Sequence, residues 1–244
     1  MNFGIIAAGE GSRLADEGLS LPKPLVEVNG MPLIGRLLHV FAMAGADTVA
    51  VVTNASRPET ARYLQTTAPS LPYRLEIRQA ITPSSMHTFA IVGDMLRGKG
   101  RFIATTVDTV FNTRAFLDYA AAYAAAPDDI DGIMAVTSFI DDEKPLYVSV
   151  DKDMDILGFK DREENPRYIS AGIYGLGDKA LDILDETLRK GVRRMRNYQR
   201  ALVEAGLRLK AYDIGKAVDV DHAADISTAA SVAGTFKDNH TWRK

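Results

Sequence analysis

The sequence predicts an α/β fold, a three-layer sandwich with a mixed, mainly parallel sheet and a small antiparallel insertion. Short apolar runs alternate with amphipathic stretches through the first half, a pattern typical of β-α-β units. After about residue 140 the apolar runs become shorter and are separated by acidic, turn-like segments too short for crossover helices. The 244 residues, 46% hydrophobic and 25% charged, fit one globular domain spanning 1–244.

Strands and helices alternate in the first 140 residues. Residues 2–7 form an apolar run that predicts a buried strand. Residues 32–44 predict a helix, because Pro32 lies near its first turn and Gly45 ends it. The remaining expected elements of this half are strands at 48–53, 73–79, 102–107 and 132–139, and helices at 57–67, 85–96 and 114–126.

The second half begins with three short strands, which make up the predicted antiparallel insertion. A pair of helices, a strand and a closing helix follow them. The three strands are expected at 146–150, 156–160 and 168–175, and the two helices at 178–190 and 195–205. The following strand is expected at 207–214, and the closing helix from about residue 221.

Composition excludes several functional classes. Lysine and arginine total 29 against 32 aspartates and glutamates, so the net charge of −3 gives no basic field for nucleic acid, and any anion must be bound locally. The absence of cysteine excludes disulfides, thiolate metal sites and cysteine nucleophiles. The opening residues lack a basic segment followed by an apolar span, so we expect a cytoplasmic protein without a membrane partner.

The first strand leads into a glycine-rich loop, Ala7-Ala8-Gly9-Glu10-Gly11-Ser12-Arg13-Leu14. Such a turn lets backbone N–H groups approach phosphates. It is not a Walker loop, because no Gly-Lys-Ser/Thr ends it. It is not the dinucleotide fingerprint either, because Leu14 stands where a third glycine is required.

A lysine between two prolines follows the loop. Pro22 and Pro24 restrict the backbone around Lys23 and disfavour a helix, so we expect its ammonium to be presented from a stiff, extended segment. Arg13 can bind phosphate oxygens bidentately, while Lys23 acts as a point charge. This division suits a triphosphate whose α-phosphorus is attacked while pyrophosphate leaves.

The loop and the Pro-Lys-Pro-Leu segment together resemble the signature of the sugar-phosphate nucleotidyltransferases, the nucleoside-diphosphate-sugar pyrophosphorylases. The resemblance implies a Rossmann-like fold of the nucleotide-diphospho-sugar transferase type. It also implies an enzyme that transfers a nucleoside monophosphate from a nucleoside triphosphate (NTP) to a small phosphorylated acceptor, a sugar 1-phosphate first of all, and releases pyrophosphate. Residues 1–140 would bind the NTP, and residues 141–244 the acceptor. Relatives with a C-terminal extension are longer, so none is expected here.

The resemblance also implies roles for particular residues. Arg13 and Lys23 would be catalytic. The nucleotide-binding residues would be Ala7, Ala8, Gly9, Glu10, Gly11, Ser12, Gln79 and Thr88. On the acceptor side, a segment similar to the family's phosphate-contacting Phe-x-Glu-Lys supplies Asp161 and Arg162, and a strand similar to the one that lines the sugar pocket supplies Gly172.

The expected cofactor is Mg²⁺, which favours one or two carboxylates together with substrate phosphates and water. Asp108 follows an apolar run, at a strand end where ligands bind in open α/β sheets, and the family carries a metal-binding aspartate there. The second ligand is expected to be Asp221, with Asp219 as the alternative, in a segment similar to the Asp-Thr-Pro-Glu-Asp-Leu of many relatives. Its proline is missing here, and the single His222 nearby is expected to be a solvated side chain.

The base-binding segment also departs from the family pattern. Gln79 is retained, but His87 stands where a glycine usually precedes the threonine, here Thr88, so the nucleobase stays open. The acceptor stays open too, since a transferase of this fold could use phosphocholine, an alditol phosphate or a pterin cofactor. A nucleotide-binding regulatory protein without turnover is a further alternative, and the sequence leaves homo-oligomer formation open.

Overall fold

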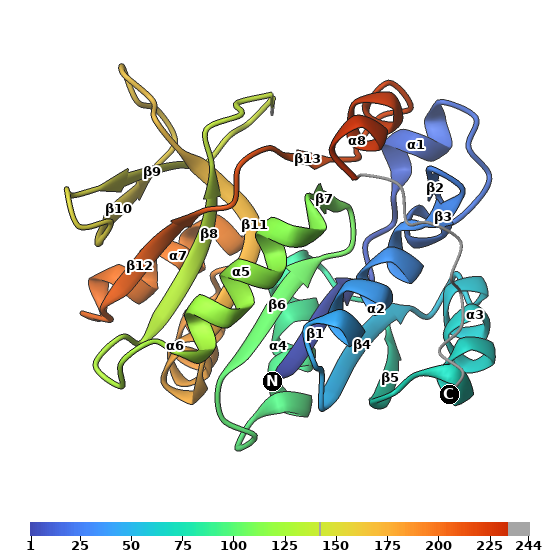
Figure 1. The fold of residues 1–244 in the computed structure, drawn as a ribbon, viewed down its shortest axis with the longest axis horizontal. Helices are drawn as coiled ribbons and strands as arrows, with labels where there is room; N and C mark the ends of the chain where they lie inside the picture. Colours follow the sequence, from blue (N-terminus) through green and yellow to red (C-terminus); the bar gives the residue numbers. More distant parts are fainter. Residues whose placement is uncertain (142, 234–244) are drawn as a thin grey trace.

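A mixed sheet runs through the molecule (Figure 1). The computed structural model describes residues 1–141 and 143–233, and within them nine strands form this sheet. These strands are β1 Asn2–Ala7, β4 Thr48–Asn54, β5 Arg74–Ala80, β6 Phe102–Thr106, β8 Gly132–Thr137, β9 Tyr147–Val150, β10 Ile156–Lys160, β11 Ile169–Leu176 and β12 Leu209–Asp213. Their order is β10-β9-β11-β6-β1-β4-β5, with β8 beside β11 and β12 beside β8. The predicted fold class is confirmed.

The parallel half contains β6, β1, β4 and β5, in that order. β1, β4 and β6 are buried almost throughout, which explains why their sequences are continuous apolar runs rather than alternating ones. Parallel neighbours require crossover connections, and helices supply them, as the alternating pattern predicted. All four strands therefore end at the same edge of the sheet.

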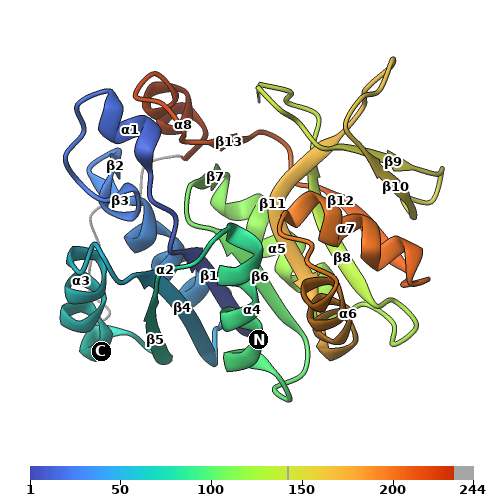
Figure 2. The ribbon, with the colours of Figure 1, turned by 180° about the vertical axis from the view of Figure 1, so that it is seen from behind.

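Helices cover both faces of the sheet. They are α2 Leu33–Met43, α3 Glu59–Thr67, α4 Ser85–Leu96, α5 Thr113–Ala124, α6 Asp178–Arg189 and α7 Met195–Glu204. Phe3 and Ile5 of β1 pack in a cluster with α2 and α5, whereas Ile6 packs in a separate cluster with α4, α6 and α7. α2 and α5 lie in front of the sheet in Figure 1, and α4, α6 and α7 lie in front in the reverse view of Figure 2.

The antiparallel strands extend the main sheet. β11 pairs antiparallel with β6 along one edge, and with β8 and β9 along the other. Its pairing with β8 shifts register between Ser170 and Tyr174, and Gly172 within that interval has φ +69°. β11 is thus bent where it passes the ends of the parallel strands.

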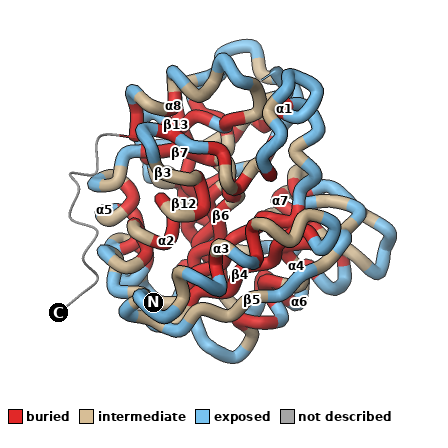
Figure 3. The backbone as a smooth tube through the Cα atoms, turned by 90° about the vertical axis from the view of Figure 1, so that its right-hand side faces the viewer, coloured by how far each residue is buried: buried red, intermediate tan, exposed pale blue. Residues whose placement is uncertain are grey.

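A third apolar cluster, containing Leu14, Val110 and Val220, closes the molecule beyond those strand ends. The elements around this cluster are α1 Ser12–Asp16, β2 Glu27–Val28, β3 Met31–Pro32, β7 Thr109–Phe111, β13 Ala217–Asp219 and α8 Asp225–Ala233. Of these, the sequence patterns predicted only the closing helix, α8. Figure 3 shows α1, β7, β13 and α8 gathered at one end, with buried segments between them.

The closing helix begins at Asp225, four residues later than expected. The Asp225 carboxylate accepts hydrogen bonds from the backbone N–H groups of Asp221 and His222, at 2.9 and 2.6 Å. These bonds hold residues 221–224 in a turn rather than a helical conformation. In the described part of the chain, no helix combines the length and the apolar character needed to cross a membrane.

Candidate active site

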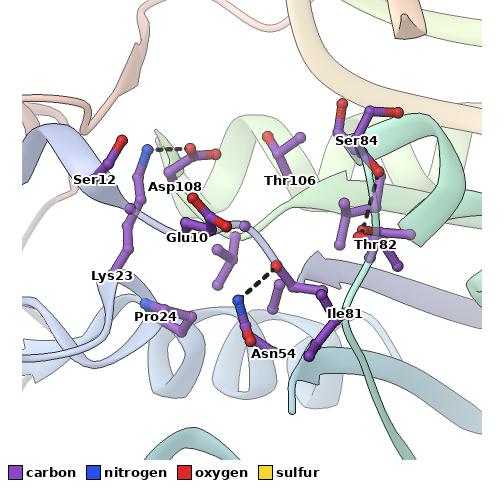
Figure 4. A pocket seen from close by; sticks show the side chains of 18 of the residues that line it. Glu10, Ser12, Lys23, Pro24, Asn54, Ile81, Thr82, Ser84, Thr106 and Asp108 are labelled. Carbon is purple, nitrogen blue, oxygen red and sulfur yellow. Dashed lines mark hydrogen bonds and ion pairs between the residues drawn. The ribbon is translucent and has the colours of Figure 1, made fainter. Parts of the chain in front are cut away.

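A cleft of about 810 Å³ opens at the carboxyl ends of the four parallel strands. Ala7, Asn54 and Thr106 line it from the ends of β1, β4 and β6, and Ile81 and Thr82 follow β5. This edge of an open α/β sheet is where ligands usually bind. Figure 4 shows the side chains that line the cleft.

The glycine loop forms one wall of the cleft. All six predicted nucleotide-binding residues from Ala7 to Ser12 line it, as does Arg13. Gly11 has φ +65°, and a Cβ atom there would lie 2.9 Å from the Cβ of Lys23. The loop can therefore pass over the lysine segment only because this position is a glycine.

Lys23 begins a short 3₁₀ helix, Lys23–Leu25, instead of lying in an extended segment as expected. Pro22 before it is extended, and Pro24 is tolerated because the first turn of a helix leaves N–H groups without intrahelical partners. The Lys23 side chain is only 12% exposed. Its Nζ atom contacts Asp108 Oδ2 and donates to Asp221 Oδ1 at 2.6 Å.

Lys23, Arg13, Asp108 and Asp221 form a cluster of charges, the Lys23 cluster, whose members depend on one another. Burial by itself would lower the pKa of Lys23, but the negative charge of Asp108 and the hydrogen bonds to Asp108 and Asp221 raise it overall. Burial would likewise raise the pKa of Asp221, but the Lys23 hydrogen bond and the charges of Lys23 and Arg13 lower it. Lysine and aspartate are therefore both ionised at neutral pH.

Asp108 and Asp221, the two expected metal ligands, face each other across the Lys23 ammonium. One ammonium contacts oxygens of Asp108 and Asp221, so the two carboxylates lie close enough to share a single cation. Among the described residues, no group of three or more histidine, cysteine, aspartate or glutamate side chains is arranged to hold a metal. Two carboxylates with substrate phosphates and water form the set that Mg²⁺ usually takes, so the residues fit this ion.

The segment that carries Asp221 is held against the glycine loop. Arg13 donates to Asp221 Oδ2 at 2.7 Å, across 208 positions of sequence. Glu17, which caps α1, accepts from the Ala223 N–H at 2.7 Å and pairs with His222 at 2.5 Å. The hydrogen bond to Glu17 raises the pKa of His222, so this histidine, expected to be solvated, takes part in the junction.

Asp219, the alternative metal ligand, has different partners from Asp221. Its Oδ1 accepts from the Thr109 hydroxyl at 2.6 Å. The protein packed around it and the negative charge of Asp108 raise the pKa of Asp219 to about 7, although its side chain still reaches solvent. Asp219 therefore stands beside the Lys23 cluster, but it makes no ion pair with the cations of that cluster within the described residues.

The predicted base-binding residues are separated in space. Thr88 lines the cleft, is buried and bonds to Thr82 at 2.7 Å. Gln79 is exposed and is absent from the lining of the cleft. The His87 ring bonds to Ser84 at 2.9 Å and also lies outside that lining.

Asn54 is a cleft residue that the sequence analysis missed. Its side chain donates to the Ala8 carbonyl at 3.2 Å and accepts from the Ser56 N–H at 2.8 Å, which fixes the glycine loop to the end of β4. Asn54 is a polar residue at the end of a buried parallel strand, and this position could have identified it as a cleft residue, as the same position identified Asp108.

The predicted acceptor residues do not lie together. Asp161 bonds to Arg196 and Arg200 of α7, at 2.6 and 2.7 Å. Arg162 is exposed, and neither it nor Asp161 lines the cleft. Gly172 packs behind the site, where a Cβ atom would lie 2.8 Å from Thr109 Oγ1. Their expected contacts with an acceptor stay predictions.

A second cavity of about 210 Å³ adjoins the cleft and shares Arg13 and Asp221 with it. Its walls come from β8, β11, β13 and the loop before α8. The remaining lining residues are Thr137, Phe139, Asp141, Glu143, Ile169, Ser170, Ala171, Ala217, Val218, Asp219, His222 and Asp225. The Asp221 side chain therefore stands between two adjoining spaces.

Known proteins share this architecture. The structure of the inositol-1-phosphate CTP transferase from T. maritima matches 98% of this chain and 96% of its own, with a TM-score of 0.80 and 18% identity. At that identity the likeness shows the fold, the nucleotide-diphospho-sugar transferase type expected from the sequence.

Sequence relatives point the same way. The "Bifunctional protein GlmU" of Methanococcus aeolicus is 25% identical over 236 residues, which cover 88% of this chain and 52% of that protein. The chain thus spans about half the length of this relative. The 2-aminoethylphosphonate cytidylyltransferase of Lancefieldella rimae is 42% identical over 48 residues, 20% of each chain. The family pattern described as the MobA-like NTP transferase domain matches residues 4–157, and the chain belongs to this family of nucleotidyltransferases.

Proposed function

We propose that this protein transfers a nucleoside monophosphate from an NTP to a small phosphorylated acceptor, a sugar 1-phosphate first of all, and releases pyrophosphate. The observation that carries the proposal is the contact of Lys23 with both Asp108 and Asp221 at the edge of a cleft lined by the glycine loop. Family membership supports the NTP half of the reaction.

Each part of the cleft has a role in this proposal. The backbone of the glycine loop binds the triphosphate, and Arg13 and Lys23 neutralise the charge that develops as pyrophosphate leaves. Asp108 and Asp221 would hold Mg²⁺, which would supply positive charge to stabilise the triphosphate during transfer. Arg13 and Lys23, now paired with carboxylates, would turn toward the phosphates when substrate enters.

No side chain needs to act as a general base. A phosphate monoester is already ionised near neutral pH, so its oxygen can attack the α-phosphorus in line once it is positioned. The second cavity adjoins the cleft at Arg13 and Asp221. We place the organic part of the acceptor there.

A second acceptor class is favoured by one observation. The 48-residue match at 42% identity is with a protein named for cytidylyl transfer to 2-aminoethylphosphonate, which is not a sugar phosphate. The structural neighbour is named for CTP and inositol 1-phosphate. CTP with an alditol phosphate, an aminoalkyl phosphonate or phosphocholine is therefore the alternative to a sugar 1-phosphate.

The test is a matrix of four NTPs against glucose 1-phosphate, inositol 1-phosphate, phosphocholine and 2-aminoethylphosphonate, with Mg²⁺, scored by pyrophosphate release. We expect release that depends on one NTP, on an acceptor and on Mg²⁺. Asp108→Asn should reduce it about 100-fold or more, because a metal ligand is lost while the side-chain volume is kept. NTP binding by calorimetry without pyrophosphate release from any pair would instead indicate a regulatory protein and refute the proposal.

A further inference from the structure

The two aspartates of the closing segment stand in different surroundings. Asp221 contacts Lys23 and Arg13 and lines both the cleft and the adjoining cavity. Asp219 lines only the adjoining cavity, and its described hydrogen bond is to Thr109. Asp219 is the last residue of β13, whereas Asp221 lies beyond the strand, where the Asp225 carboxylate holds the backbone in a turn, so the two side chains meet different partners.

Thr109 fixes the Asp219 carboxylate. The two residues are directly opposite each other where β13 pairs antiparallel with β7. The Thr109 hydroxyl donates to Asp219 Oδ1 at 2.6 Å, and its oxygen lies 2.7 Å from the hydroxyl of Thr106. Because Thr109 gives its only hydroxyl proton to Asp219, the Thr106 hydroxyl must donate to Thr109. The two threonines thus form a directed chain of hydrogen bonds that ends on Asp219.

Gly172 makes room for this chain. It lies at the bend of β11 with φ +69°, and a Cβ atom there would approach Thr109 Oγ1 to 2.8 Å and Thr106 Oγ1 to 2.9 Å. Any larger side chain would push the hydroxyl pair away from Asp219. β11, the adjoining ends of β6 and β7, and β13 therefore combine to hold one carboxylate oxygen.

The other oxygen, Oδ2, has no hydrogen-bond partner within the described residues, and the side chain reaches solvent in the cavity. Among the described residues, the lining of this cavity carries five carboxylates, but only one arginine and one histidine. The carboxylates belong to Asp141, Glu143, Asp219, Asp221 and Asp225. Such walls accept hydrogen bonds, so they favour a ligand group that donates them and oppose a bare phosphate.

We infer that Asp219 is a specificity-determining residue that binds a hydroxyl or ammonium donor on the organic part of the acceptor, and that Thr109 is its positioning residue. The inference rests on the proposed function, since it assigns the acceptor of that reaction to the adjoining cavity. It also assigns the two aspartates separate tasks: Asp221 faces the NTP and its metal, and Asp219 faces the acceptor.

The test compares Asp219→Asn with Asp221→Asn. Acceptor affinity is measured by calorimetry, with Mg²⁺ and a non-reacting analogue of the NTP present, and acceptor KM and kcat are measured where turnover occurs. The acceptors are inositol 1-phosphate, which offers hydroxyls, 2-aminoethylphosphonate, which offers an ammonium, and phosphocholine, whose quaternary nitrogen offers no N–H.

We expect Asp219→Asn to weaken binding of the donor-bearing acceptor about tenfold or more, while Mg²⁺ and NTP affinity stay within about twofold. Asp221→Asn should weaken Mg²⁺ and NTP binding.

Thr109 variants test the positioning role. Thr109→Val removes the hydroxyl at nearly constant volume and should raise acceptor KM with little change in kcat, whereas Thr109→Ser keeps the hydroxyl and should restore the wild-type KM. Thr187→Val is the matched control, because Thr187 is also buried but bonds to its own helix at the Ile183 carbonyl, 2.6 Å away. The control should leave acceptor KM unchanged.

The outcomes separate the two proposals. If Asp219→Asn weakens Mg²⁺ binding as Asp221→Asn does, or leaves acceptor affinity unchanged, the inference is wrong. If the wild type prefers phosphocholine, it is also wrong. Acceptor binding that depends on Asp219 without any turnover would refute the proposed function and support the inference, and no acceptor binding to the wild type would refute both.

Discussion

The Lys23 ammonium and the Asp221 carboxylate are joined by a hydrogen bond of 2.6 Å, although 198 positions separate them in the sequence. The same ammonium contacts Asp108, so one cation lies between two carboxylates from distant strand ends. Both the stability of the closing segment and the proposed chemistry depend on this contact.

Replacing Lys23 should make stability depend on Mg²⁺. Lys23→Met leaves two partly buried carboxylates facing each other, and loss of one partner of such a cluster costs about 3 kcal/mol of unfolding free energy. A divalent ion can replace the missing charge, so Mg²⁺ should recover most of the loss. Urea unfolding with and without Mg²⁺ measures the effect. Lys179→Met removes a lysine that is 78% exposed from its pair with Asp131, and it should cost little stability and show no Mg²⁺ response. Equal stability of Lys23→Met and wild type without Mg²⁺ would contradict the prediction.

Removing Glu17 should loosen the metal segment. Glu17→Ala deletes the acceptor of the Ala223 N–H and the partner of His222, so residues 221–225 keep only the Arg13–Asp221 bond to α1 among the contacts described above. We expect Mg²⁺ and NTP affinity to fall severalfold, because more order must be gained on binding. Asp16→Ala is the matched control, since this neighbouring carboxylate is exposed and makes none of these contacts. An unchanged affinity in Glu17→Ala, measured by calorimetry, would show that the junction does not act on the site.

Gly172 should tolerate no side chain. Gly172→Ala adds a Cβ within 3 Å of two threonine oxygens at a positive φ, and we expect a loss of about 2 kcal/mol in unfolding free energy. Gly158→Ala, in β10, is the control, because a Cβ there meets no atom within 4 Å. Denaturant unfolding of both variants gives the comparison, and an equal loss in the two would argue against the steric explanation.

Asp161 should stabilise the fold in a pH-dependent way. Hydrogen bonds from Arg200 and Arg196 lower its pKa, so its contribution is present above the unfolded value near 3.8 and is lost as pH falls through the lower folded value. Asp161→Asn should therefore be less stable than the wild type at pH 7, with the difference shrinking below pH about 4. Urea midpoints across pH measure this effect, and the exposed Asp128→Asn is the control. A difference that grows on acidification would have the wrong sign.

Acceptor KM of the same Asp161→Asn variant addresses the acceptor role expected from the sequence. A raised KM with stability fully retained would support direct contact with the acceptor. A lowered stability with unchanged KM would limit Asp161 to joining β10 and α7.

Elements with strong local patterns were predicted well. α4 and β10 have the expected bounds, and β1, β4, β5 and β6 alternate with helices as expected, since buried parallel strands and amphipathic helices have periodicities that can be read from neighbouring residues. The elements β2, β3, β7 and β13, two or three residues long, were missed. Strands this short carry too few residues for a periodicity, and β7 and β13 exist only through pairing with each other across more than a hundred residues.

The sequence by itself determined the α/β class, the glycine loop and the presence of Arg13, Lys23 and Asp108 at strand ends or turns, because spacing and residue type act through near neighbours. The tertiary structure decided which charges meet. It brought Asp221 to Lys23 and Asp219 to Thr109, left Gln79 outside the cleft and paired Asp161 with α7. Contacts between segments remote in the chain depend on how the sheet packs and where its strands end, and no local pattern in the chain records that information.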